Sequence, residues 1–144
     1  MTVERVLEHK GRQVTTVLPE HSVADAGKLL EDKRIGAAVV TDQKGRIIGL
    51  LSERDLVRGM GAYGSAVMSM PVRNLMSSEV VTCTPQDSVK SLLELMTNRR
   101  FRHLPVVEDG QLTGIISIGD LVHRRITDQE LELGVLRDQA RMRA

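Results

Sequence analysis

The sequence predicts an α+β protein that is built from two copies of one β-α-β-β-α unit. Residues 14–58 align with residues 80–123 across a single one-residue gap, which falls in the turn around Lys44. Within each copy, short β-rich runs alternate with stretches whose apolar residues recur at helical spacing. Positions that match between the copies include Pro19 and Pro85, Ser22 and Ser88, Gly49 and Gly114, Ser52 and Ser117, and Asp55 and Asp120.

Each copy begins with a short β-rich run, residues 14–17 in the first and residues 80–83 in the second. A proline ends each run, because proline cannot donate a hydrogen bond to a sheet. A helix is expected next, since Ser22 or Ser88 can cap its first turn and the following apolar residues fall on one face. These apolar residues are Val23, Ala26, Leu29 and Leu30 in the first copy, and Val89, Leu92, Leu93 and Met96 in the second.

Two further strands and a second helix complete each copy. Both strand pairs flank a short turn that ends in glycine, which is a typical hairpin signal. The expected strands are 37–41 and 47–51 around the turn 42–45, and 104–107 and 112–117 around the turn 108–110. The second helix is expected to begin after Ser52 in the first copy and after Ser117 in the second.

The predicted organisation has five segments. They are an N-terminal segment 1–13 with a small helix, repeat 1 over 14–62, a linker 63–79 with a short helical stretch, repeat 2 over 80–126, and a C-terminal helix 127–144. Strands and helices that each have one apolar face predict layered packing. A copy of about 45 residues buries too little surface to be stable alone. The copies are therefore expected to share one core across a pseudo-twofold interface, with clefts between them.

Composition narrows the class of protein. The chain has 144 residues and a formal charge of +1, and its aromatic residues are Tyr63 and Phe101. A formal charge this close to zero gives no reason to expect a polyanionic partner. The one cysteine, Cys83, excludes an internal disulfide and suits a reducing compartment. No apolar run approaches the roughly 20 residues that span a bilayer, so we expect a cytoplasmic protein without membrane contact.

Three motifs resemble those of tandem cystathionine-beta-synthase (CBS) domains. They are the runs 49–55, GLLSERD, and 114–120, GIISIGD, together with 102–107, RHLPVV. The resemblance covers roughly residues 14–125, and the pattern Gly-apolar-apolar-Ser-x-x-Asp occurs twice at the same place in the repeated frame. It implies a regulatory module that is not an enzyme, needs no cofactor, and binds AMP, ADP, ATP, NAD(H) or S-adenosylmethionine. It also implies a homodimer that signals to an unidentified effector protein.

The resemblance further implies two composite clefts, each of which joins the Ser-x-x-Asp of one copy to strands of the other. The first would combine Ser52, Arg54 and Asp55 with Val80, Val81, Phe101, Arg102 and His103. The second would combine Ser117 and Asp120 with Val14, Thr15, Ile35, Gly36 and Ala37. An aspartate in the first turn of a helix can accept hydrogen bonds from both ribose hydroxyls. The serine hydroxyl and the free N–H groups at the helix start favour phosphate.

Structural explanations compete with the ligand-binding ones. Ser-x-x-Asp before an apolar helix is also a capping box, so a ligand-independent dimeric adaptor is the alternative function. Residues 59–64 spell G-x-G-x-x-G, but they follow a helix and not a strand, so we interpret them as linker. The basic cluster 99–103 could contact nucleic acid, yet stacking aromatics are scarce, and a solvated helix end explains most of it. No nucleic-acid partner is expected.

Metal binding and catalysis are not expected either. The four histidines, His9, His21, His103 and His123, lack metal-ligand spacing. Cys83 falls in an expected strand, where a buried inert thiol is the ordinary situation. No nucleophile elbow is present, and the duplicated module takes up nearly all of the chain.

Overall fold

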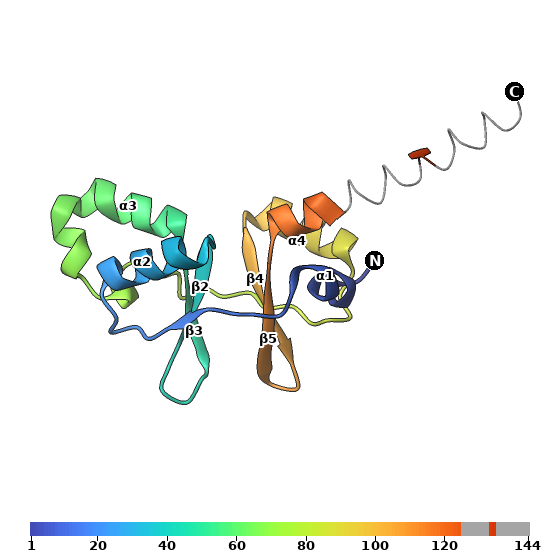
Figure 1. Ribbon diagram of the computed structural model, residues 1–144, viewed down its shortest axis with the longest axis horizontal. Helices are drawn as coiled ribbons and strands as arrows, with labels where there is room; N and C mark the ends of the chain where they lie inside the picture. The colour runs from blue at the N-terminus through green and yellow to red at the C-terminus, as the bar shows by residue number, and fades with distance from the viewer. Residues whose placement is uncertain (125–132, 135–144) are drawn as a thin grey trace, which may run out of the picture. The chain divides into compact units, whose positions relative to one another are not determined.

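The structure is a computed structural model, and it describes residues 1–124, 133 and 134 (Figure 1). The chain divides into two compact units. Unit 1 consists of Met1–Arg12 and Thr82–Ala144, and unit 2 consists of Gln13–Val81. The predicted C-terminal helix 127–144 lies almost wholly outside the described residues. Within the described part, no helix has the length and apolar character needed to cross a membrane.

Unit 2 contains the first repeat. Its elements are β1 (Thr16–Val17), α2 (Val23–Lys33), β2 (Ala37–Thr41), β3 (Ile47–Ser52), α3 (Glu53–Tyr63) and two 3-10 turns, η1 (Gly64–Ser69) and η2 (Val72–Asn74). β2 pairs in parallel with β1 and antiparallel with β3. The core of this unit consists of buried apolar side chains from its helices and its sheet, namely Val17, Ala26, Leu30, Ala38, Val40, Leu51 and Val72.

Unit 1 contains the second repeat. Its elements are α1 (Val3–Lys10), α4 (Val89–Arg99), β4 (His103–Glu108) and β5 (Gln111–Ser117), followed by helical residues 118–124. β4 and β5 form an antiparallel hairpin. Buried side chains from the helices and strands, among them Leu7, Met96, Leu104 and Ile116, form the core. The α+β class is thus confirmed, and the order helix, strand, strand, helix recurs in both repeats.

Two predictions need correction. Residues 80–83 were expected to form a strand, but only Cys83 pairs, through a single parallel bridge to Val106. Residues 59–63, interpreted as linker, continue α3 to Tyr63. Gly59 is buried in α3, and a Cβ atom there would lie 2.8 Å from Leu75 and 2.9 Å from Val67, so glycine permits α3 to pack closely against the segment that follows it.

The helix caps agree with the sequence prediction. Ser22 accepts a hydrogen bond from the Asp25 N–H, and Ser88 accepts one from the Ser91 N–H. Each serine side chain thereby satisfies one of the unpaired donors in the first helical turn. Ser52 caps α3 in the same way through the Asp55 N–H.

A short segment before each repeat packs on the other repeat in the chain. The Val3 N–H donates to Asp87 O at 2.9 Å, and the Val72 N–H donates to His21 O at 2.8 Å. His21 and Asp87 occupy matching positions of the two repeats. The N-terminal residues therefore pack on repeat 2 in the same way as residues 70–76 pack on repeat 1. The duplication thus extends beyond the repeats of about 45 residues.

Candidate functional site

Asp55 lies in the first turn of α3 and is held by a reciprocal capping box. Its Oδ2 accepts hydrogen bonds from the Ser52 N–H at 2.8 Å and from the Ser52 hydroxyl at 3.1 Å. The Asp55 N–H donates to Ser52 Oγ at 3.3 Å. The Glu53 N–H donates to Gly36 O at 2.9 Å, so the start of α3 is tied to the start of β2. These bonds fix a half-buried carboxylate at one end of the hairpin.

Asp120 repeats this arrangement in unit 1. Its Oδ2 accepts from the Ser117 N–H at 2.8 Å, and its own N–H donates to Ser117 Oγ at 3.0 Å. The Ile118 N–H donates to Arg102 O at 2.8 Å, which matches the bond between Glu53 and Gly36 in repeat 1. The two Ser-x-x-Asp motifs are thus presented by equivalent backbone frames.

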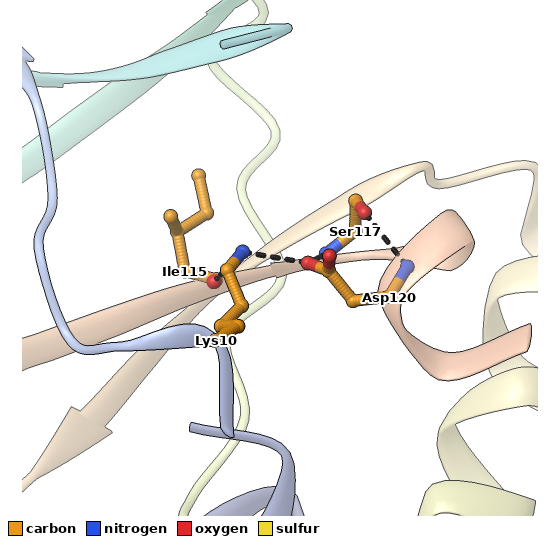
Figure 2. A network of polar contacts seen from close by, with 4 residues as sticks. All are labelled: Lys10, Ile115, Ser117 and Asp120. Atoms are coloured by element: carbon orange, nitrogen blue, oxygen red, sulfur yellow. Dashed lines mark hydrogen bonds and ion pairs between the residues drawn. The ribbon is translucent and has the colours of Figure 1, made fainter. Parts of the chain in front are cut away.

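Lys10 is a neighbour of Asp120 that the sequence analysis did not identify. Its Nζ lies 2.6 Å from Asp120 Oδ2 and 2.7 Å from Ile115 O (Figure 2). Burial alone would raise the pKa of Asp120, but the bonds from Lys10 and Ser117 outweigh burial and lower the pKa below its ordinary value. Asp120 is therefore a charged carboxylate at neutral pH.

Within each unit, the structure places a residue of one predicted cleft beside a residue of the other predicted cleft. Ala37 pairs with Ser52 across β2 and β3, and His103 pairs with Ser117 across β4 and β5. The remaining residues of the predicted site are mostly half-buried; they are Val14, Thr15, Ile35, Val80, Val81 and Phe101, with Arg54 and Arg102 exposed. The expected joining of each aspartate to strands of the other copy stays a prediction.

The chemistry available at each motif is that of an oriented carboxylate. A carboxylate in this position can accept hydrogen bonds from ligand hydroxyls, while the adjacent serine hydroxyl and main-chain groups contribute polar contacts. Among the described residues, no group of three or more histidine, cysteine, aspartate or glutamate side chains is placed to hold a metal ion. The capping bonds also show that each aspartate stabilises its helix, so capping and ligand binding would share one side chain.

A duplicated α+β module with matched Ser-x-x-Asp helix starts defines a class of paired small domains. The family model of the CBS domain matches residues 5–62 and 72–126. The chain belongs to the CBS-domain family, and it is a pair of CBS domains, a module that is generally regulatory.

Known proteins agree with this assignment. A crystal structure of a CBS-domain containing protein from Agrobacterium tumefaciens is 44% identical, has a TM-score of 0.83, and covers 86% of this chain and 92% of its own. The CBS domain-containing protein YhcV of Bacillus subtilis is 32% identical over 81% of this chain and 82% of its own length. A CBS domain pair crystallised with 5'-methylthioadenosine and S-adenosyl-L-methionine shares the fold at 19% identity, with a TM-score of 0.78 over 90% of this chain and 98% of its own.

Proposed function

We propose that this chain is a sensor that binds an adenosine-containing ligand, among AMP, ADP, ATP, NAD(H) and S-adenosylmethionine, and signals to a separate effector protein without catalysing a reaction. The observation that carries the proposal is the matched presentation of Asp55 and Asp120. Both are half-buried carboxylates in the first turn of a helix, held by the serine three residues earlier. A carboxylate of this kind accepts the two hydroxyls of a ribose.

The module that was crystallised with two adenosine compounds supports the ligand class. Of its two ligands, S-adenosyl-L-methionine is a sulfonium compound and 5'-methylthioadenosine is a thioether. Neither carries a phosphate, so the adenosine group is the part that they share. A ligand that binds one conformation of the pair better than another shifts the population toward that conformation. Regulation of an effector would follow from that shift.

The first experiment is a thermal-shift series with AMP, ADP, ATP, NAD, NADH and S-adenosylmethionine, with GTP as the control ligand. A ligand at 100 times its dissociation constant stabilises the protein by about 2.7 kcal/mol, which raises the midpoint by several degrees. We expect at least one adenosine ligand to do so, and we expect Asp55→Ala or Asp120→Ala to abolish the shift.

Asp25→Ala is the matched control. Asp25 lies three residues after the helix cap Ser22, in the same Ser-x-x-Asp spacing, but outside the proposed site. Its replacement therefore reproduces the loss of an acidic first-turn residue and should leave the ligand shift intact. If no adenosine ligand changes the midpoint at millimolar concentration, the aspartates serve only as caps and the adaptor function replaces the sensor.

We also propose a homodimer that forms through the second helices of the repeats. Val57 and Met60 lie on one face of α3 and are 67% and 59% exposed, and the matching residue of repeat 2, Val122, is 41% exposed. Apolar side chains that gather on one helix face favour contact with a partner. The Val57→Glu variant is expected to run as a monomer.

Light scattering coupled to size exclusion measures this directly at micromolar concentration. The parent protein should have the mass of two chains, and Lys28→Glu, at an exposed position of α2, should leave that mass unchanged. A parent protein with the mass of one chain would refute the dimer.

A further inference from the structure

Lys10 makes the two Ser-x-x-Asp motifs chemically different. In repeat 2 its ammonium lies 2.6 Å from Asp120 Oδ2, with the two side chains 32% and 26% exposed. In repeat 1 the ion pairs among the described residues involve other carboxylates, and Asp55 has none. The second donor to the aspartate Oδ2 is thus the Ser52 hydroxyl in repeat 1 and the Lys10 ammonium in repeat 2.

The backbone explains why Lys10 is held at this place. In repeat 1 the Leu50 carbonyl accepts a hydrogen bond from the Ser77 N–H at 2.9 Å. The matching carbonyl in repeat 2 belongs to Ile115, and it accepts from Lys10 Nζ at 2.7 Å instead. Figure 2 shows the ammonium between this carbonyl and the Asp120 carboxylate. In repeat 2 the Lys10 ammonium thus takes the place of the main-chain N–H that binds this carbonyl in repeat 1. From there it also binds the Asp120 carboxylate.

The ion pair competes with a ribose for Asp120. A carboxylate oxygen offers about two acceptor sites, and Oδ2 already accepts from the Ser117 N–H and from Lys10. Two ribose hydroxyls that bind the carboxylate in a bidentate way take one acceptor site on each oxygen. A diol bound in this way displaces the ammonium from Oδ2, and the ammonium then pairs with water or with an anionic group of the ligand.

We propose that Lys10 is a specificity-determining residue, which makes the Asp120 site prefer adenosine ligands that carry a phosphate over neutral or cationic ones. The inference rests on the proposed function, because it takes Asp120 as the ribose acceptor. A phosphate gives the displaced ammonium a new anionic partner, and the flexible lysine stem lets the charge follow it. Adenosine offers no such partner, and the sulfonium of S-adenosylmethionine adds a second positive charge.

The test compares the dissociation constants of AMP and adenosine by calorimetry. All variants are made in the Asp55→Ala background, so that the Asp120 site is the one measured. Lys10→Met removes the charge and keeps the length of the side chain, while Lys10→Arg keeps the charge. We expect Lys10→Met to reduce the preference for AMP over adenosine by about tenfold or more, since hydrogen bonds to charged groups contribute at this level. Lys10→Arg should retain most of the preference.

Controls separate the possible failures. Lys44→Met removes a lysine charge from the exposed turn between β2 and β3 and should not change the preference. Lys10→Gln serves as a second neutral variant if Lys10→Met does not fold, as judged by circular dichroism. Binding with the same AMP preference in the neutral variants would overturn the role of Lys10 and leave the proposed function standing. Absence of AMP and adenosine binding in the parent protein would overturn this inference, whereas the proposed function falls only if the thermal-shift series with all six adenosine ligands is also negative.

Discussion

The Leu7→Ala variant is expected to lose about 2–5 kcal/mol of the free energy of unfolding of unit 1. Leu7 is 1% exposed. Its side chain fills the space above Gly114 of β5, where an added Cβ would lie 2.9 Å from Leu7 Cδ2. Removal of the side chain leaves a cavity between α1 and β5. The loss is a large part of the roughly 5–15 kcal/mol that stabilises an ordinary domain.

Cys83 provides a probe that reports on unit 1. It is buried in that unit, and burial, assisted by the nearby charge of Asp87, raises the pKa of its thiol to about 12. The native thiol should therefore react slowly with iodoacetamide at neutral pH, because the thiolate is the reactive form. Opening of the unit exposes the thiol, so Leu7→Ala should speed alkylation by a factor on the order of 30 or more.

The matched control is Glu8→Ala, at an exposed position of the same helix. It should alkylate at the parental rate. A second check is the double variant Leu7→Ala/Gly114→Ala, in which the new methyl group enters the space that Leu7 left. We expect the double variant to be more stable than Leu7→Ala alone, since residues in contact do not behave additively. Equal alkylation rates for Leu7→Ala and Glu8→Ala would show that α1 contributes little to unit 1.

The sequence predicts the body of each repeat well, because local signals agree with the tertiary structure there. The expected strand 37–41 matches β2, and Ser22, Ser52 and Ser88 cap their helices as predicted. Residues 80–83 are different: they are rich in β-branched residues, but only Cys83 reaches a partner strand. A strand exists only where a neighbour accepts its hydrogen bonds, and composition alone does not supply that neighbour.

The residues of the candidate site also divide into those that local sequence signals identify and those that they do not. Ser52, Asp55, Ser117 and Asp120 are recognisable because their spacing is local and is repeated. Lys10 is not, because 110 positions separate it from Asp120 in the sequence. A signal was nevertheless present: residues 2–7, TVERVL, weakly resemble residues 71–76, PVRNLM. Alignment of these two segments would have shown that the N-terminal helix is the counterpart of residues 71–76.

Gly49→Ala is expected to lose about 1–3 kcal/mol of the free energy of unfolding of unit 2, as overpacked cores do. Gly49 lies in β3, where an added Cβ would meet Met76 Sδ at 2.5 Å and the Ser77 carbonyl oxygen at 3.1 Å. The methionine end can shift. The Ser77 main chain cannot, because two hydrogen bonds of 2.9 Å tie it to Leu50. The new methyl group must therefore disturb the backbone that closes this edge of the unit.

Urea unfolding followed by the fluorescence of Tyr63, the single tyrosine of the chain, measures the effect in unit 2. Gly61→Ala is the matched control, because no atom lies within 4 Å of an added Cβ at that exposed helical position. It should stabilise α3 by about 0.5–1 kcal/mol, since alanine favours helix over glycine. Glycine-to-alanine substitution is thus expected to change the free energy of unfolding in opposite directions at two positions of one unit. A Gly49→Ala variant as stable as the parent would mean that Met76 repacks without moving Ser77.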